Sequence, residues 1–397
     1  MRTHNKRKGI KIMYTKEQLN NLYERIVKTI DISNEMFDAA EQEYLQLGNW
    51  IDKAMPQYDI SVYTQGSFAL GTVIKPIDDQ NDYDLDLVCE FARQYGLSAE
   101  ELKCSVVKPL LLKYRKTKRD IEEKRRCWHV KYEDVPLFHM DIIPAVNRNT
   151  YIDITDHNED VDTYDYIGSN PKGYIEWFNG KKAERRRIIC ENYCKDNREQ
   201  ITCSADVEKI KEYHLKTPLQ KAIQILKRHR NIMFKDDTKH LKPISIIITT
   251  IAADLYKNED NIVDALANFL NNAEKYINEK KIGSEYHIDN PTYTGGDVEN
   301  FADKWNEHPE RATAFFAWLN KAKHDLVDTR INNLLRTQLA ENFSQALGAT
   351  TARNVFNEIA KEERAAIENQ SKKIDTTTGA ISSSGSVPIP RSHHYGQ

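Results

Sequence analysis

The pattern of apolar and polar positions divides the chain into a mixed first half and a helical second half. Apolar residues recur every three or four positions at about 15–30 and 33–54, which predicts two amphipathic helices. Strand patterns follow at 59–63, 84–90, 127–132 and 137–143, and a charged helical region is predicted over 99–126. The last two strands are expected to form a hairpin across Glu133 and Asp134.

From about residue 215 the pattern is helical throughout. Short polar breaks separate helices that we predict at 217–234, 243–257, 261–278, 297–307, 309–326 and 329–347. A mixed sheet followed by a run of helices predicts an α+β protein with two lobes, and a substrate cleft between them. The tail from about residue 370 is rich in Ser, Thr, Gly and Pro and cannot bury a core, so we expect it to be disordered.

Composition is that of an ordinary globular chain. Of 397 residues, 40% are hydrophobic and 29% charged, and the net charge of −3 argues against a surface that binds nucleic acid as a whole. No secretory signal is visible and the longest apolar run, 244–253, is too short to span a bilayer. We therefore expect a cytoplasmic protein, with no membrane association, whose six cysteines are reduced thiols.

The first twelve residues form a basic, unpatterned leader. The segment 15–18 fits a helix-capping box, so the patterned chain begins near Met13, which is an alternative initiator.

Three aspartates in strand-like surroundings are the main candidates for chemistry. Asp84 and Asp86 project from the same face of one predicted strand, because successive side chains of a strand alternate between faces. Asp141 interrupts a second apolar run that ends at Pro144. If the two strands are neighbours, the three carboxylates can hold two Mg²⁺ ions, or Mn²⁺, roughly 3.5–4 Å apart, the spacing used for in-line phosphoryl displacement.

A small-residue turn, Gln65-Gly66-Ser67, precedes these acidic residues. Gly66 allows the backbone to approach a triphosphate, and Ser67 can donate a hydrogen bond to it. The alternative is that the acidic residues form only the solvated face of an edge strand. Asp82 has the same strand parity as the pair and competes for the role, although the polar run before Asp84 places it in a loop.

Three segments together resemble the bacterial cGAS/DncV-like nucleotidyltransferases (CD-NTases) of the DNA polymerase β-like superfamily. They are 65–76 (QGSFALGTVIKP), 82–88 (DYDLDLV) and 139–145 (HMDIIPA). The resemblance covers about 15–363 and implies a polymerase β-like core, with a mixed sheet and the 33–54 helix as its spine, and a C-terminal helical lobe. The expected division is a leader at 1–12, a nucleotidyltransferase core at 13–214, a helical lobe at 215–367 and a disordered tail at 368–397. The stretch between Ser67 and Asp84 is longer than in many superfamily members.

The resemblance also implies residues that bind the triphosphate. Family members carry a Lys on a helix at the position of Lys227 and a Ser at the start of the next helix, which matches Ser245. Arg230 lies three residues after Lys227 on the same helical face and is a further candidate. Without the resemblance, a solvated basic helix face is the more common explanation of such spacing.

The implied activity is metal-dependent synthesis of a cyclic di- or trinucleotide from NTPs, ATP or GTP, with release of pyrophosphate, and a role in antiphage (CBASS) signalling. Asp84, Asp86 and Asp141 would hold the metal ions, and Gln65, Gly66 and Ser67 would contact the nucleotide. Two alternatives stay open: a template-independent polymerase acting on RNA, and an inactive nucleotide-binding partner. No obligatory nucleic acid is expected.

Other patterns have ordinary structural explanations beside functional ones. Cys190, Cys194, Cys203 and His214 resemble a zinc-ligand set, but their gaps are irregular. Asn300 and Trp305 fit a helix cap and a core aromatic better than base contacts. The basic clusters at 118–119, 124–126 and 181–187 are interleaved with glutamates, which favours charged helix faces over an RNA site. The last ten residues, 388–397, could be bound by, or conjugated to, a partner protein, although the chain ends in Gly-Gln and not in a bare glycine.

Overall fold

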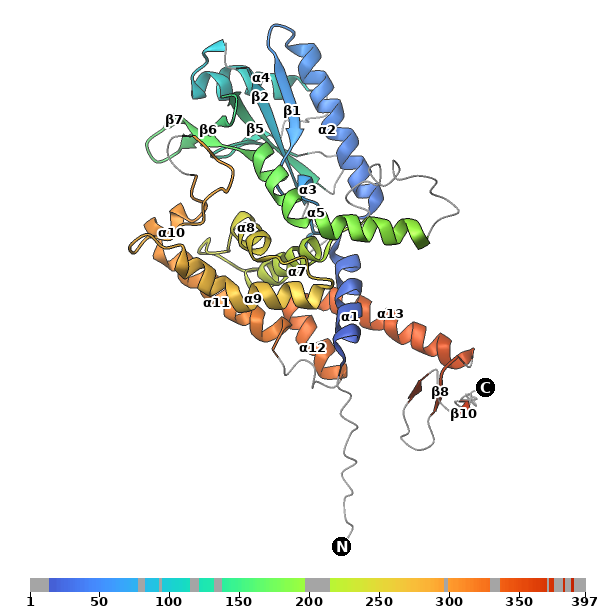
Figure 1. Cartoon of the computed structure of the whole chain (residues 1–397). Helices are drawn as coiled ribbons and strands as arrows, with labels where there is room; N and C mark the ends of the chain where they lie inside the picture. Colours follow the sequence, from blue (N-terminus) through green and yellow to red (C-terminus); the bar gives the residue numbers. More distant parts are fainter. Residues whose placement is uncertain are drawn as a thin grey trace.

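The computed structural model describes residues 14–77, 83–92, 95–114, 121–131, 138–196, 215–295, 299–328, 336–369, 371–374, 381–382 and 387–388. Two lobes are visible in Figure 1: a sheet with helices against it, and a bundle of helices below. The expected α+β fold class is confirmed. Residues 1–13, which include the leader and Met13, lie outside the described residues.

The sheet lobe is built on a mixed sheet with the strand order β1-β2-β5-β4-β3. Strands β2 and β5 run parallel at its centre, and the other pairs are antiparallel. Strand β6 continues the sheet from β5, and β7 pairs with β6. The bounds are β1 Ile60–Thr64, β2 Tyr83–Phe91, β3 Ile121–Glu123, β4 Trp128–Lys131, β5 Phe138–Asn147, β6 Ile152–Asn158 and β7 Thr163–Ser169.

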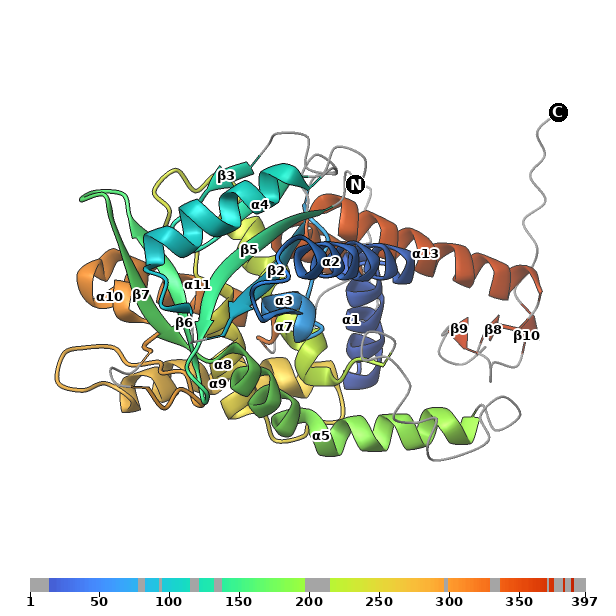
Figure 2. The same ribbon diagram turned by 90° about the horizontal axis from the view of Figure 1, so that it is seen from above.

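Alternation along β2 separates the core from the opposite face of the sheet. Leu85, Leu87 and Cys89 are fully buried in a cluster shared with helix α2 (Asn34–Ala54), the π-helical segment η2 (Glu101–Val107) and α4 (Lys108–Lys113). Figure 2 shows α2 and α4 against the sheet. Asp84 and Asp86 have the opposite parity and therefore face away from this core, towards the helical lobe.

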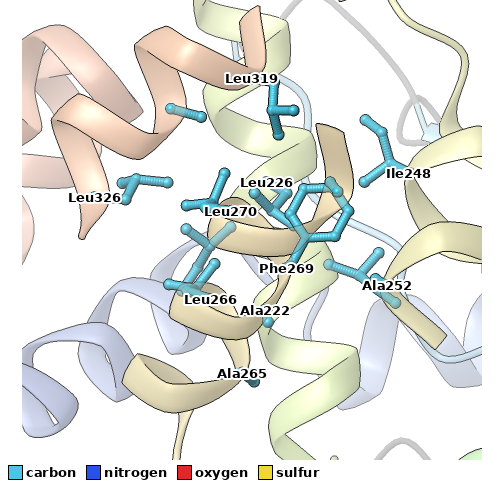
Figure 3. Packing of buried hydrophobic residues seen from close by; sticks show 14 of the residues in the cluster. Ala222, Leu226, Ile248, Ala252, Ala265, Leu266, Phe269, Leu270, Leu319 and Leu326 are labelled. Atoms are coloured by element: carbon cyan, nitrogen blue, oxygen red, sulfur yellow. The ribbon is translucent and has the colours of Figure 1, made fainter. Parts of the chain in front are cut away.

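The helical lobe has one continuous hydrophobic core. It contains α7 (Pro218–Met233), α8 (Ser245–Leu255), α9 (Ile262–Glu279), α10 (Asp303–Glu307), α11 (Pro309–Leu326), α12 (Arg336–Leu347) and α13 (Ala349–Glu368). Figure 3 shows Leu226 of α7, Phe269 of α9 and Leu319 of α11 meeting at its centre. This packing fixes the position of α7 against α9 and α11, while another face of α7 borders the sheet lobe.

Two helices from the first half of the chain join the helical lobe. Helix α1 (Lys16–Ile30) begins at the expected capping box, in which Thr15 Oγ accepts from the Gln18 N–H at 3.2 Å and the Gln18 side chain accepts from the Thr15 N–H at 2.9 Å. Its apolar face packs in the helical-lobe core. Helix α5 (Pro171–Asp196) crosses from the sheet to the helical lobe, where Phe178 is fully buried (Figure 1).

The structure differs from several predicted elements. The region 99–126 is not one helix. It consists of η2 followed by α4, which ends at Lys113, and then of β3. Within the segment 297–307, residues 299–302 are not helical, because the Asn300 side chain caps a tight turn by accepting from the N–H groups of Ile288 and Ala302. Three two-residue strands, β8 (Lys373–Ile374), β9 (Ile381–Ser382) and β10 (Val387–Pro388), pair within the tail that we expected to be disordered.

Candidate active site

A cavity of about 640 Å³ lies between the sheet and the helical lobe. Its walls come from β2 and the short helix α3 (Gly66–Ala69), from the loop 70–77, and from α7, α8 and the loop before α8. Seven of the residues predicted from the sequence line it: Gly66, Ser67, Asp84, Asp86, Lys227, Arg230 and, at the start of α8, Ser245. Segments far apart in the chain thus contribute to one cavity.

The Gly66 turn is packed directly against the second aspartate. Gly66 has φ +60°, and a Cβ atom at this position would lie 2.1 Å from Asp86 Oδ2. The preceding Gln65 donates its backbone N–H to the Asp86 carbonyl at 2.9 Å, and Gln65 is not among the residues that line the cavity. Glycine is required here for two independent reasons, the left-handed backbone and the close approach.

Strand register brings the three aspartates to one face of the sheet. In the parallel pair β2–β5, Asp86 is the direct partner of Asp141. Paired residues of neighbouring strands project to the same face, so Asp141 lies on the side of Asp84 and Asp86. The expected convergence of the three carboxylates is therefore observed, while Asp82 lies outside the described residues.

Two histidines that sequence reasoning missed stand beside these carboxylates. His139 of β5 is the register partner of Asp84, and its Nε2 lies 2.8 Å from Asp84 Oδ1. His129 of β4 is the register partner of Asp141, and its Nδ1 lies 2.8 Å from Asp141 Oδ1. The available signal was parity: His139 is two residues before Asp141 and so shares its face.

The pKa values of Asp84 and Asp86 are shifted in opposite directions. The pKa of Asp86 is raised to about 7, by burial and by the neighbouring charges of Asp84 and Asp141. Burial also acts on Asp84, but the hydrogen bond and charge of His139 outweigh it, so the pKa of Asp84 falls below its ordinary value. Crowded carboxylates of this kind gain from a divalent cation with oxygen ligands, and this donor set fits Mg²⁺ or Mn²⁺.

The opposite wall of the cavity is cationic. Lys227 and Arg230 of α7 are each 6% exposed, and Lys242 lies on the loop before α8. Burial and the charge of Arg230 lower the pKa of Lys227 to about 7, and burial lowers the pKa of Arg230 to about 10. Lys242, which the sequence did not single out, has a pKa lowered by burial and by Arg230.

Hydrogen bonds fix the direction of these cations. Lys227 Nζ donates to the Thr72 carbonyl at 3.0 Å, which places the ammonium beside the loop after α3. Arg230 donates to the Pro243 carbonyl at 3.0 Å and to Ser245 Oγ at 2.8 Å. A ligand with several negative charges would meet these groups at the side of the cavity facing Asp84 and Asp86.

The remaining candidates from the sequence make ordinary structural contacts. Trp305 is 5% exposed in the helical-lobe core. Lys181 pairs with Asp254, and Arg185 donates to the Asn258 carbonyl, so two members of the 181–187 cluster bind their own chain. These contacts leave little of the cluster for an RNA ligand.

Other basic and metal candidates are only partly described. Arg125 and Arg126 both contact Asp156 at 2.8 and 3.0 Å, and the cluster at 118–119 lies outside the described residues. Cys190 is buried and Cys194 half-buried on α5, whereas Cys203 and His214 lie outside the described residues, so the zinc set stays a prediction. No helix among the described residues is both long and apolar enough to cross a bilayer.

Part of the sheet lobe matches a known protein family. Residues 60–144 match the family model described as cyclic GMP-AMP synthase DncV-like, nucleotidyltransferase domain. A c-di-GMP synthase from Roseivirga ehrenbergii is 27% identical over 325 residues, which is 79% of this chain and 80% of the relative. The cyclic dinucleotide synthase CdnG from Bradyrhizobium diazoefficiens is 23% identical over 70% of this chain and 67% of its own length.

Solved structures extend the likeness of fold to both lobes. The Bradyrhizobium diazoefficiens CdnG in complex with GTP aligns with a TM-score of 0.67 at 20% identity, over 86% of this chain and 98% of that one. Escherichia coli CdnC with ATP aligns with a TM-score of 0.57 at 12% identity, over 83% and 97%. The resemblance seen in the sequence is therefore confirmed: residues 60–144 match the DncV-like nucleotidyltransferase model, and both lobes have the fold of the solved CD-NTases.

Proposed function

We propose that this protein is a nucleotidyltransferase that joins NTPs into a cyclic oligonucleotide and releases pyrophosphate. The observation that carries the proposal is the arrangement of the cavity, in which Asp84, Asp86 and Gly66-Ser67 face the buried cations Lys227 and Arg230. The named activities of the two similar relatives, both cyclic dinucleotide synthases, support the same reaction class.

The reaction requires that the triphosphate be bound and that the acceptor hydroxyl be positioned, and residues of this chain can do both. Lys227, Arg230 and the hydroxyls of Ser67 and Ser245 would bind and orient the triphosphate, because charge-assisted hydrogen bonds favour phosphate oxygens. The acceptor hydroxyl of a second nucleotide would lie near Asp141. As its oxygen bonds to the α-phosphorus, the bond from that phosphorus to pyrophosphate breaks, and the hydroxyl proton leaves to a nearby carboxylate or to water.

We propose that Asp84, Asp86 and Asp141 hold divalent cations, Mg²⁺ or Mn²⁺. When bound, such ions lower the pKa of the attacking hydroxyl and neutralise the charge that develops on the departing pyrophosphate. The raised pKa of Asp86 fits this role, since burial and the charges of Asp84 and Asp141 outweigh the opposing charges of Lys227 and His139.

GTP is the first substrate to test. The similar relative from Roseivirga ehrenbergii is a c-di-GMP synthase, and the structural neighbour CdnG was solved with GTP. We propose GTP, alone or with ATP, as substrate, with a cyclic dinucleotide as product. A role in antiphage signalling and a protein that binds the tail remain predictions.

The decisive experiment is product analysis. The chain is incubated with Mg²⁺ and each NTP alone or in pairs, and the products are treated with phosphatase before mass spectrometry. We expect a phosphatase-resistant cyclic product and one pyrophosphate for each bond formed. Linear products that lose their terminal phosphates would instead indicate a template-independent polymerase, and tight NTP binding with no pyrophosphate release would indicate an inactive partner.

A further inference from the structure

Two imidazoles and one carboxylate come together on β4 and β5, next to the aspartate pair. The ligand atoms of His129, His139 and Asp141 all lie within 4.8 Å of one another. The two imidazole rings are in contact, with centroids 4.1 Å apart. His139 is 8% exposed, and the side chains of His129 and Asp141 are 12% and 24% exposed, so the group is sheltered but reachable from solvent.

Strand register explains why these three groups meet. Asp86, Asp141 and His129 form one row across β2, β5 and β4, and Asp84 and His139 lie in the next row. His129 therefore stands on the far side of Asp141 from Asp86. Asp141 has one neighbour that offers carboxylate oxygens and another that offers imidazole nitrogen.

The chemistry of the donors separates the two sides. Carboxylate oxygens suit Mg²⁺, while imidazole suits first-row transition ions such as Zn²⁺, Co²⁺ and Ni²⁺. His129 Nδ1 and Asp141 Oδ1 are 2.8 Å apart, so both can lie about 2.1 Å from one ion. The Cys127 thiol, which makes a hydrogen bond to Asp141, adjoins the group as a further soft donor.

We propose that His129, His139 and Asp141 form a binding site for a transition-metal dication of the Zn²⁺ class, separate from the aspartate pair but sharing Asp141 with it. One consequence rests on the proposed function. Because an ion held by the imidazoles draws Asp141 away from Asp86, Zn²⁺ in excess over this site should inhibit Mg²⁺-supported synthesis.

Zinc binding without nucleotide tests the site directly. Zn²⁺ is titrated against a chromophoric chelator, with the full chain carrying Asp84→Asn, Asp86→Asn, Cys190→Ser and Cys194→Ser, so that the aspartate pair and the α5 thiols do not contribute. We expect this parent to bind Zn²⁺, and His129→Gln or His139→Gln added to it to weaken binding at least tenfold. Glutamine can still donate a hydrogen bond to the side-chain oxygen beside it, so it removes the nitrogen ligand and keeps the orienting contact.

A control and a second readout make the test specific. His308, whose side chain is 52% exposed on the helical lobe, is replaced by Gln as a matched loss of one imidazole, and zinc affinity should not change. Pulsed EPR of bound Cu²⁺, a paramagnetic ion that also favours imidazole ligands, should show coupling to imidazole nitrogen that disappears in the His129 and His139 variants. Thermal unfolding of each variant checks that the fold is kept.

Two results would overturn the site. Equal zinc affinity in the parent and in both histidine variants, or no nitrogen coupling, would mean that the imidazoles only orient Asp84 and Asp141. The outcome is independent of the catalytic proposal: a chain that binds Zn²⁺ through His129 but makes no product with Mg²⁺ keeps the site and rejects the function. An active enzyme whose zinc affinity is the same with and without the histidine substitutions keeps the proposed function and rejects the zinc site.

Discussion

The two walls of the cavity carry charges of opposite sign, and these charges are stabilised in different ways. The carboxylate wall is formed by Asp84 and Asp86 of β2, with Asp141 of β5 beside Asp86 but not among the residues that line the cavity, and the charges of these three groups repel one another. The cationic wall (Lys227, Arg230, Lys242) lies on and beside α7, and two of its members already donate to backbone carbonyls. The carboxylate wall therefore needs an added cation more than the cationic wall needs an added anion, and metal should bind before or together with nucleotide.

The largest effect should come from removing the carboxylate pair. Asp84→Asn with Asp86→Asn keeps side-chain volume but removes the charges that would hold the metal ions, so synthesis from NTPs should fall by at least about a thousandfold. Pyrophosphate release measures the loss, and circular dichroism checks the fold. Asp162→Asn, on the turn between β6 and β7, is the matched control, since its side chain is 89% exposed. Unimpaired synthesis by the double variant would contradict the role of Asp84 and Asp86 in the reaction.

Gly66→Ala tests how closely the turn approaches the carboxylate wall. The new Cβ would collide with Asp86, so we expect activity to fall on the order of a hundredfold and stability by a few kcal/mol. Gly96 is a matched control with the same φ of +60° and no atom within 4 Å of its ideal Cβ. Gly96→Ala should cost only about 1–2 kcal/mol of backbone strain and leave kcat unchanged. Equal activity of the two variants would contradict the close approach.

Lys227→Met tests the cationic wall. Methionine fills a similar space without the charge, so KM for NTP should rise about 10–100-fold, with a smaller change in kcat. Lys221 is a control on the same helix, since it pairs with Glu24 outside the cavity. Equal KM values for the Lys227→Met and Lys221→Met variants would show that α7 does not contact the triphosphate.

The smallest effect concerns the stability of the carboxylate wall without metal. The pKa of Asp86 is about 7 in the folded chain and about 3.9 when unfolded, so the folded state holds a proton between these values that the unfolded state has released. Stability therefore falls as pH rises from about 4 to 7. Asp86→Asn should escape this fall and be the more stable protein at pH 8, with no difference below pH 4.

Urea unfolding of both proteins at several pH values measures that difference. Mg²⁺ should reduce the difference in unfolding free energy between the two proteins at pH 8, because a bound cation stabilises the charged carboxylate of the unsubstituted chain. A variant less stable at pH 8 than the unsubstituted chain would contradict the direction of the Asp86 shift.

The sequence predicted the carboxylate wall well because strand parity is a local property. Alternation alone placed Asp84 and Asp86 on one face, and the apolar run around Asp141 identified β5. The contribution of His129 needed the antiparallel register of β4 on β5, which no local pattern contains.

The cationic wall was harder to predict, because its residues meet through tertiary packing. Spacing on α7 could not separate Lys227 from a solvated lysine, and only the resemblance favoured it; its burial depends on the loop at Thr72. Helix α5 was missed because the apolar residues that it packs into the helical-lobe core, among them Tyr174 and Phe178, lie in its first turns, and charged residues follow, so no continuous stripe runs along it. Strands β6 and β7 were missed because polar residues interrupt their short apolar patterns.

The most direct test of metal binding by Asp84, Asp86 and Asp141 is a crystal structure grown with Mn²⁺ and an NTP analogue that cannot be cleaved between the α- and β-phosphates. We expect anomalous peaks for two ions touching Asp84 and Asp86, one of them also touching Asp141, with the triphosphate between Ser67 and Lys227. A nucleotide bound in the cavity with no ion at Asp84 and Asp86, or ions that leave Asp141 without contact, would contradict it.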